Sequence, residues 1–213
     1  MGRLNERLAV YVVTDERADH ASLLTVCAEA LKGGAGTVQL RRKRDTGRVL
    51  IQLGQALRRM TAQYGALYIV NDRLDVALAT DADGVHIGQD DIPLVYARRL
   101  MGSKIIGVSA CTLSQARLAA ENGADYLGVG AIFPTPSKPD ADVSGLKGLE
   151  AIAAEVHSCP LIAIGGITEG NARDVLEAGA HGLAVVSAVM SADSPRNAAE
   201  RFRSLVTSGG RRD

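Results

Sequence analysis

The sequence predicts a single-domain (β/α)8 TIM barrel of the α/β class. Eight short apolar runs rich in β-branched residues alternate with longer stretches in which apolar residues recur every three or four positions. This alternation is typical of βα units around a parallel sheet, and no Pro/Ser-rich linker interrupts it. Eight consecutive units most economically close into a barrel, although ~250 residues is typical and this chain has 213. An open doubly wound sheet is the alternative.

The eight predicted strands are nearly continuous apolar runs, as expected of strands covered on both faces. In chain order they are Leu8–Val13, Thr37–Leu40, Leu67–Val70, Gly84–Ile87, Ile105–Val108, Tyr126–Val129, Leu161–Ile164 and Gly182–Val186. The segments ENGADYLGVG and EAGAHGLAVV resemble each other, which indicates a weak internal repeat of helix, turn and strand. We expect the barrel domain to span residues 1–206, with a flexible C-terminal tail over 207–213.

Composition excludes several classes of protein. Lys+Arg and Asp+Glu both number 24, aromatic residues make up 3%, and there is no Trp. A nucleic-acid partner or an anionic membrane surface is therefore not expected. The apolar runs fall far short of the ~20 residues of a membrane span, and the charged start lacks a signal-peptide core, so a cytoplasmic protein is expected. The cysteines Cys27, Cys111 and Cys159 form no CxxC pair and are expected to be packing residues. The sequence leaves a homo-oligomer open.

Three polar residues lie along and just past the second predicted strand. Gln39, Arg41 and Lys43 are spaced by two, so all three side chains point the same way. Two cations and an amide at a strand end suit a polyanion such as a phosphate or diphosphate. The alternative is a solvated charged run, because other charged residues stand beside them. Those residues are Arg42, Arg44 and Asp45.

Carboxylates follow the next two strands. Asn71 and Asp72 end the third strand, and Asp91 comes shortly after the fourth. Neighbouring parallel strands are ~4.8 Å apart, so these carboxylates could share one hard cation. Mg²⁺ fits, because it commonly takes one or two carboxylates, waters and substrate phosphate oxygens. Taken singly, each aspartate is more typical as an N-cap of the following helix.

Polar loops also follow the later strands. The loop Phe133–Lys138 carries two hydroxyls and an ammonium between prolines, which suits an anion, although a surface turn is equally compatible. Gly165 and Gly166 follow the seventh strand and Ser187 follows the eighth, where barrels frequently bind phosphate. The alternative is that the paired glycines only allow a tight turn. His86 lies in an apolar strand, and we expect a packed, hydrogen-bonded histidine rather than a catalytic one.

Seven motifs occur in an order that resembles the thiamine-phosphate synthase family. They are QLRRK at 39–43, ND at 71–72, GVHIGQDD at 84–91, GVS at 107–109, GVGAIFPTPSK at 128–138, AIGGI at 163–167 and VVSA at 185–188. The resemblance covers roughly Leu8 to Leu205. It implies a (β/α)8 barrel that joins a hydroxymethylpyrimidine diphosphate to a thiazole phosphate, giving thiamine phosphate and diphosphate by a dissociative, Mg²⁺-assisted reaction.

The resemblance also implies roles for individual residues. Asp72 and Asp91 would bind Mg²⁺, and Arg41, Lys43, Ser109 and Lys138 would be catalytic. The pyrimidine diphosphate would be held by Gln39, Arg41, Lys43, Asn71, Ser109 and Lys138. The thiazole phosphate would be bound by Thr135, Pro136, Ser137, Gly166, Val186 and Ser187. No protein nucleophile is needed, because the reaction requires that leaving-group charge be neutralised and that two substrates be held face to face.

Two positions depart from the family pattern. Ser137 stands where a second Thr is common, and Cys111 stands where His is frequent, so fine affinity is in doubt rather than reaction type. A related thiazole tautomerase is one alternative, although such relatives typically use a His near the position of Ser109. A non-catalytic phosphate-binding barrel is another, but it has no evident use for an Asp72/Asp91 pair. A sugar-phosphate epimerase or isomerase needs an acid and a base at strand ends, which the sequence does not favour.

Overall fold

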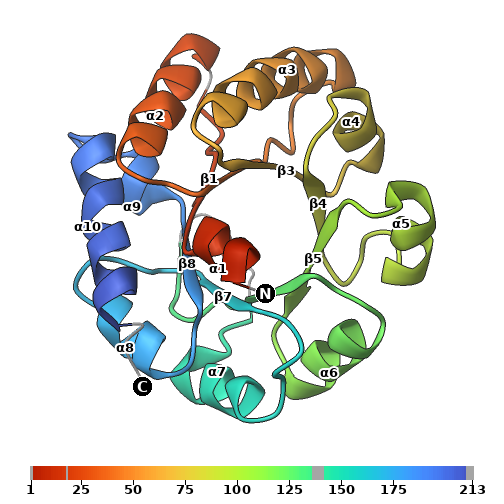
Figure 1. The fold of residues 1–213 in the computed structure, drawn as a ribbon, viewed down its shortest axis with the longest axis vertical. Helices are drawn as coiled ribbons and strands as arrows, with labels where there is room; N and C mark the ends of the chain where they lie inside the picture. The colour runs from red at the N-terminus through yellow and green to blue at the C-terminus, as the bar shows by residue number, and fades with distance from the viewer. Residues whose placement is uncertain (1, 18, 136–141, 210–213) are drawn as a thin grey trace.

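The computed structural model describes residues 2–17, 19–135 and 142–209. Eight parallel strands form a closed barrel in the order β1 to β8, and β8 pairs with β1 (Figure 1). The predicted (β/α)8 architecture is therefore confirmed, and the open sheet is excluded. The strands are β1 (Val10–Val13), β2 (Thr37–Leu40), β3 (Leu67–Asn71), β4 (Gly84–Ile87), β5 (Ile105–Ala110), β6 (Tyr126–Val129), β7 (Leu161–Ile164) and β8 (Gly182–Val185).

The helices surround the strands, with one exception (Figure 1). The surrounding helices are α2 (His20–Lys32), α3 (Gly47–Gln63), α4 (Leu74–Ala79), α5 (Leu94–Met101), α6 (Leu113–Glu121), α7 (Gly145–Ala153), α8 (Ala172–Glu177), α9 (Ser187–Met190) and α10 (Pro195–Gly209). The exception is α1 (Gly2–Leu8), which lies across one end of the barrel. Because α10 continues to Gly209, the helix passes the predicted domain boundary at residue 206, and that boundary stays a prediction.

The ends of the chain's first and last strands differ from the predicted ones. Leu8, predicted to open the first strand, ends α1 instead, and β1 begins at Val10. The apolar side chains of α1 do not continue the strand; Leu4 and Leu8 pack into the barrel interior and close that end. Val186, predicted to end the last strand, is the N-cap of α9. In both places an apolar residue serves a helix end rather than a strand, which apolar runs alone do not distinguish.

The molecule has two apolar regions, one inside the barrel and one between the sheet and the helices. Alternate residues of a strand serve each region; in β1, Tyr11 and Val13 face inward, whereas Val10 and Val12 face the helices. The outer region is almost wholly aliphatic, in agreement with the low aromatic content. In the described residues, no helix is long and apolar enough to cross a membrane.

The internal repeat has a structural basis at the amino ends of the strands. The Asp125 carboxylate accepts a hydrogen bond from Ile106 N at 2.8 Å, and His181 Nδ1 accepts one from Leu161 N at 3.2 Å. Asp83 does the same for Tyr68 N at 2.8 Å. In each case, the residue just before one strand satisfies a backbone N–H at the start of its neighbour. The repeated segments thus complete the hydrogen bonding of the barrel at the end opposite to the strand carboxyl ends.

Replacing Asp83 by Ala is expected to destabilise the fold by about 1–3 kcal/mol, because Tyr68 N–H and Arg58 both lose their acceptor. Urea unfolding followed by circular dichroism measures the change. The matched control is Asp81→Asn, which keeps a residue that tolerates the left-handed φ of 49° and removes ion pairs to Arg58 and Lys104 from a side chain that is 77% exposed, so it should cost much less than Asp83→Ala. Equal losses for the two variants would contradict this role of Asp83.

Candidate functional site at the carboxyl ends of the strands

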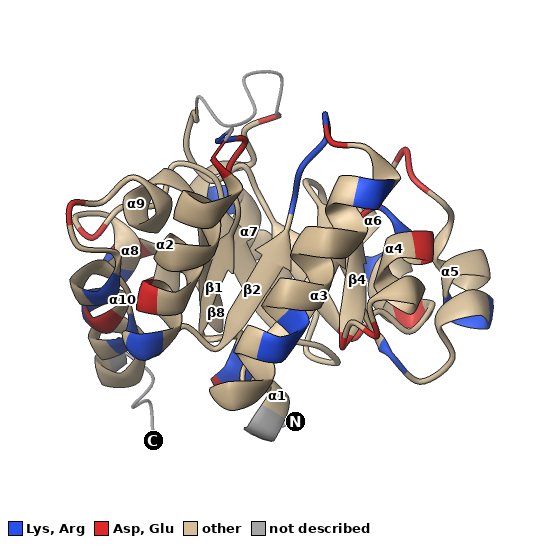
Figure 2. Cartoon of the chain, turned by 90° about the horizontal axis from the view of Figure 1, so that it is seen from above, with Lys and Arg blue, Asp and Glu red and all other residues tan. Residues whose placement is uncertain are grey.

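Polar side chains gather where the strands end, opposite to α1. In Figure 2, loops that carry Lys, Arg, Asp and Glu project at this end of the barrel, whereas α1 lies at the other. The predicted site residues come from the ends of β2, β3 and β5 and from the loops after β4, β7 and β8. Barrel closure brings these ends to one rim, which is where barrel enzymes place their active sites.

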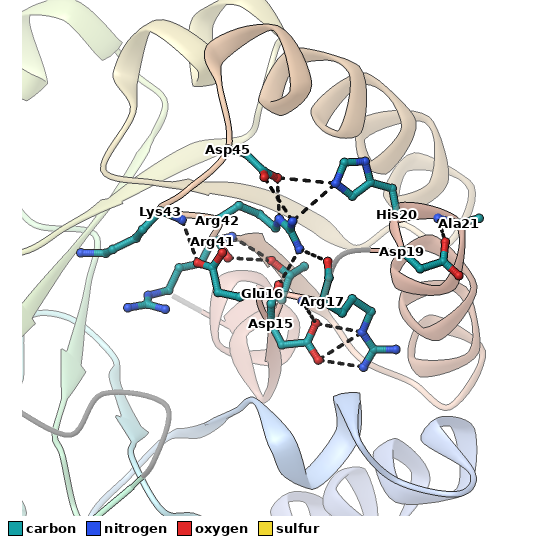
Figure 3. Close-up of polar contacts among 11 residues, drawn as sticks. Asp15, Glu16, Arg17, Asp19, His20, Ala21, Arg41, Arg42, Lys43 and Asp45 are labelled. Atoms are coloured by element: carbon teal, nitrogen blue, oxygen red, sulfur yellow. Dashed lines mark hydrogen bonds and ion pairs between the residues drawn. The ribbon is translucent and has the colours of Figure 1, made fainter.

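Successive side chains of the QLRRK segment, residues 39–43, point in alternating directions. Gln39 is buried in β2, and its Nε2 donates to the Tyr11 hydroxyl at 2.8 Å. Arg41 is fixed through its backbone, since its N–H donates to Thr14 Oγ1 at 2.9 Å and its carbonyl accepts from the same hydroxyl. Arg41 and Lys43 extend to one side in Figure 3, and the Arg42 side chain extends to the other. The predicted common direction of positions 41 and 43 therefore holds.

Arg42 is a buried structural cation rather than part of a solvated run. Its side chain is only 4% exposed, and Nε lies 2.6 Å from Asp45 Oδ2. The guanidinium also donates to the carbonyls of Asp15 and Arg17 in the loop after β1 (Figure 3). These bonds tie the loop after β2 to the loop after β1. The solvated-run alternative is wrong for Arg42 and Asp45, because their opposite charges fold back onto each other.

The loop after β1 continues this ion network toward the last strand. Arg17 forms a bidentate pair with Asp15, with Nη2 2.7 Å from Oδ2, and also donates to the Met190 carbonyl at the end of α9. Burial alone would raise the pKa of Asp15, but the hydrogen bonds and charge of Arg17 outweigh it and lower that pKa. Asp15 therefore stays ionised, and the three loops after β1, β2 and β8 are linked.

The Asp72 and Asp91 carboxyl groups lie next to each other. Burial raises the pKa of Asp72, the neighbouring Asp91 raises it further, and Lys43, whose Nζ is 3.4 Å from Asp72 Oδ2, opposes the rise. Asp72 has a left-handed φ of 59°, and its N–H donates to the His86 carbonyl at 2.8 Å. Asp91 Oδ2 accepts from Gly88 N at 2.7 Å. These backbone bonds hold the two carboxyl groups together at adjacent strand ends.

Neither aspartate caps a helix, so the N-cap alternative is wrong for both. The N-cap of α4 is Arg73 and that of α5 is Pro93, and no side-chain cap bond is present at either. The Asp72 carboxylate lies instead beside Asp91 and Lys43. Lys43 can balance only one of the two like charges, and this favours the metal hypothesis over a structural role.

The donor set suits a divalent cation that is completed by other ligands. Two carboxylates are present, and among the described residues no group of three or more His, Cys, Asp or Glu side chains could enclose an ion. A site of this kind fits Mg²⁺, which keeps several waters and takes substrate phosphate oxygens. It does not fit a structural zinc, which needs four protein ligands.

Ser109 and His86 face each other across β4 and β5. His86 Nε2 lies 2.9 Å from Ser109 Oγ, and Nδ1 lies 3.0 Å from the Tyr126 hydroxyl. Burial lowers the pKa of His86 to about 4. The prediction of a packed, hydrogen-bonded histidine is therefore confirmed. Asn71 pairs in register with His86 on the adjoining strand, which places the Asn71 side chain at the same rim.

The glycine loop after β7 lies beside the loop after β6. Gly165 and Gly166 have φ values of +100° and +63°, which only glycine adopts readily. Asn171 Nδ2 donates to the Gly166 carbonyl at 3.0 Å and holds this turn, while Phe133 N donates to the Gly165 carbonyl at 3.0 Å. The loop is therefore a braced turn with its backbone at the rim.

The remaining predicted residues of the thiazole-phosphate site lie in the loops after β6 and β8, and part of the loop after β6 falls outside the described residues. Ser187 is the first residue of α9 and directly follows Val186, so both residues lie just past the carboxyl end of β8. Thr135 is the last described residue of its loop, and Pro136, Ser137 and Lys138 lie outside the described residues. Cys27 and Cys159 are buried, as predicted for packing residues. Cys111 is half-buried, with Sγ 2.9 Å from the Gly130 carbonyl.

Comparison with known proteins agrees with this geometry. The family model described as thiamine monophosphate synthase matches residues 10–189. The thiamine-phosphate synthase of Chloroflexus aurantiacus is 53% identical over 200 residues, which cover 93% of this chain and 92% of that protein. The thiamine phosphate pyrophosphorylase structure from Pyrococcus furiosus superposes with a TM-score of 0.88 at 44% identity, covering 97% of this chain and 99% of that one.

The chain belongs to the thiamine monophosphate synthase family. This membership confirms the predicted resemblance. Relatives of the family also include the thiamine-phosphate synthase of Pyrococcus furiosus, which is 46% identical over 203 residues, covering 95% of this chain and 97% of that protein. Among the predicted site residues, Asp72 and Ser109 lie at the carboxyl ends of their strands, and Gln39 is buried within β2.

Sequence patterns did not indicate the residues that hold this site in place. Thr14, Arg17 and Arg42 fix the loops, and Tyr11 and Tyr126 join Gln39 to His86 inside the barrel. A buried Tyr in an apolar strand is more typical of core packing, so its hydroxyl gave no signal. The i,i+3 spacing of Arg42 and Asp45 was the one available sign of an ion pair.

We expect Arg42→Lys to destabilise the fold by about 1–3 kcal/mol, because one ammonium cannot satisfy two carbonyls and a bidentate carboxylate in the same directions. Chemical denaturation measures the loss. Arg44→Lys is the control, because Arg44 is exposed and its replacement should change stability by under about 0.5 kcal/mol. If both variants unfold at the same denaturant concentration as the parent, Arg42 does not brace the loops.

The lowered pKa of His86 predicts that the free energy of unfolding depends on pH. Its pKa is about 4 in the folded chain and ordinarily ~6.5 when unfolded, so the unfolded chain binds the proton more tightly between these values. The contribution of His86 is thus complete above pH 6.5 and is lost as the pH falls toward 4, by at most about 3 kcal/mol. Urea unfolding of the parent and of His86→Gln should show a stability difference that narrows over this range; a constant difference would contradict it.

Proposed function

We propose that this chain is a thiamine-phosphate synthase that joins a hydroxymethylpyrimidine diphosphate to a thiazole phosphate and releases diphosphate. The observation that carries the proposal is the Asp72–Asp91 pair beside Lys43, at the rim of a barrel that belongs to this family. Two carboxylates and a cation at one point suit a diphosphate with its divalent counterion. Small-molecule substrates and a cytoplasmic location form part of the proposal.

The cationic residues would act on the leaving group. Arg41 and Lys43 extend to the same side of the segment that Arg42 anchors, so they would contact the diphosphate without rearrangement of the loop. When the C–O bond to diphosphate breaks, negative charge builds on the leaving oxygen, and fixed cations stabilise that charge. Lys138 is assigned the same role, on the basis of the sequence motif alone.

Asp72 and Asp91 would hold Mg²⁺. When bound, this ion would supply positive charge to the diphosphate oxygens and lower the cost of their departure. The two carboxylates would otherwise repel each other, which agrees with the raised pKa of Asp72. Gln39, Asn71 and Ser109 would orient the pyrimidine from the strand ends next to the carboxylates.

The thiazole phosphate would occupy the opposite part of the rim. Backbone groups of Gly166, Val186 and Ser187 would bind its phosphate, and Thr135, Pro136 and Ser137 would contact it from the loop after β6. The brace from Asn171 to the Gly166 carbonyl supports a preformed turn. The two substrates would then face each other across the barrel mouth, so that the thiazole nitrogen captures the pyrimidinylmethyl cation with little loss of entropy in the reactive step.

The other candidate functions fit less well. A thiazole tautomerase would need no diphosphate, and a phosphate sensor would need no cation, so the adjacent carboxylates would lack a role in both. The test is incubation with the pyrimidine diphosphate and the thiazole phosphate, with and without Mg²⁺, while thiamine phosphate and diphosphate are measured. Product only when both substrates and Mg²⁺ are present supports the synthase; tautomerised thiazole or no product overturns it.

Asp72→Asn is expected to abolish Mg²⁺-dependent turnover while leaving the fold intact. Asn tolerates the left-handed φ of 59° at this position, so the variant removes charge rather than backbone geometry. Steady-state diphosphate release at several Mg²⁺ concentrations measures the effect. Asp90→Asn is the matched control, because Asp90 is exposed beside Asp91. Normal diphosphate release by Asp72→Asn would show that the metal assignment is wrong.

Lys138→Ala is expected to lower kcat by about 10- to 100-fold with a smaller change in KM, because the charge that the ammonium neutralises grows in the transition state. Initial rates at varied pyrimidine diphosphate concentration separate the two constants. Lys147→Ala provides the comparison, since Lys147 is an exposed cation on α7. An effect confined to KM would mean that Lys138 contributes only to ground-state binding.

A further inference from the structure

Five polar side chains form one continuous hydrogen-bond chain inside the barrel. Gln39 Nε2 donates to the Tyr11 hydroxyl at 2.8 Å, and the Tyr11 and Tyr126 hydroxyl oxygens are 2.7 Å apart. The Tyr126 hydroxyl lies 3.0 Å from His86 Nδ1, and His86 Nε2 lies 2.9 Å from Ser109 Oγ. The chain thus joins two residues assigned to the pyrimidine site, one on β2 and one on β5, through three residues assigned no function.

The number of hydrogens in this chain fixes its direction. Each tyrosine hydroxyl has one proton. Since Gln39 donates to the Tyr11 oxygen, Tyr11 gives its own proton to Tyr126, and Tyr126 gives its proton to His86 Nδ1. In the reverse order the Tyr11 oxygen would accept from both sides, and its own proton would be left without a partner among these residues. That arrangement is costly, because Tyr11 is 2% exposed.

This direction determines the state of the last two members. His86 Nδ1 accepts, so the neutral ring carries its hydrogen on Nε2 and donates it to Ser109 Oγ. A ring protonated on both nitrogens could not accept the Tyr126 proton, so this order of donors requires the neutral imidazole. The Ser109 oxygen therefore accepts from His86, and its own hydroxyl proton is available to the site. Gln89 Nε2 donates to the Ser109 carbonyl at 2.6 Å and fixes the backbone of the same residue.

Two glycines make room for the chain. A Cβ atom on Gly107 would lie 2.0 Å from Tyr126 Cζ, and one on Gly128 would lie 2.8 Å from His86 Cε1. The Tyr126 ring also contacts those of Tyr11 and His86, with centroid separations of 5.9 and 5.5 Å. The two rings thus occupy space that any side chain at positions 107 and 128 would fill.

We propose that Tyr11, Tyr126 and His86 are positioning residues that orient the Ser109 hydroxyl as a hydrogen-bond donor toward an acceptor atom of the pyrimidine diphosphate. The assignment of Ser109 to that substrate rests on the proposed function. The direction of the chain does not, because it follows from contacts within the free protein. The two statements can therefore fail separately.

The first experiment reads the tautomer of His86 in the free protein. Protein labelled with ¹⁵N-histidine is examined at pH 7 by long-range ¹H–¹⁵N correlation, with His86→Gln used to assign the ring. We expect a protonated Nε2 and an unprotonated Nδ1. The opposite tautomer would overturn the proposed direction, whether or not the protein turns over its substrates.

The second experiment breaks the chain with Tyr126→Phe. Without the hydroxyl, Nδ1 has no donor, so His86 is expected to become a mixture of tautomers and kcat/KM for the pyrimidine diphosphate to fall about tenfold, while KM for the thiazole phosphate stays unchanged. Tyr68→Phe is the matched control: Tyr68 is equally buried, and its hydroxyl accepts from Thr80 outside the chain. It should alter stability alone.

These outcomes separate positioning from packing. If Tyr126→Phe and Tyr68→Phe have the same kinetic constants, the Tyr126 hydroxyl serves only the fold, and the proposal is wrong. If Tyr126→Phe does not fold, Tyr11→Phe and the tautomer of the unaltered protein provide the test. If the unaltered protein has the expected tautomer but forms no thiamine phosphate, the proposed function fails and the direction of the chain stands.

Discussion

Closure of the barrel between β1 and β8 is the constraint on which the rest of the structure depends. Each strand is short, and β1 pairs with β2 on one side and β8 on the other. Closure removes the free edges and brings eight strand ends to one rim. The contact between Arg17 and the Met190 carbonyl, which are 173 positions apart, exists for this reason. Every loop then needs to contribute only one or two groups to the site.

The rim contains two kinds of cation with different roles. Arg42 and Arg17 are matched by Asp45 and Asp15, so their charge is used to hold backbone in place. Lys43 lies instead beside Asp72, where burial and then the neighbouring Asp91 raise the pKa of Asp72 against the opposing effect of Lys43. A protein with no net charge thus places two carboxylates and one ammonium at one point of the rim, and the divalent cation proposed for this point would balance the excess negative charge.

Sequence periodicity predicted all eight strands to within two residues at each end, because strands covered on both faces are almost entirely apolar. The gathering of polar residues such as Asp72 and Asp91 at one rim could be predicted because the carboxyl ends of barrel strands meet there, whereas their roles stay a prediction. The structural role of Arg42 could not be predicted from the sequence, because what sets Arg42 apart from Arg41 and Lys43 is the direction of its side chain (Figure 3). The α1 helix was missed because Leu4 and Leu8 fill the barrel end with the same residue type that a strand would use.

The barrel interior argues against a purely structural origin for the hydrogen-bond chain. Aliphatic side chains such as Ile69 and Ile162 share the interior with the chain and pack without polar groups. Tyr11 is the second residue of β1 and Tyr126 is the first residue of β6, so the chain starts near the amino ends of these strands and reaches Ser109 near the end of β5 through His86. Each of its buried polar atoms must be satisfied at some cost in freedom. Aliphatic side chains would fill this space, but they could not hold Gln39 and Ser109 in fixed orientations. The hydrogen-bond chain is therefore best understood as a support for the site from inside the barrel.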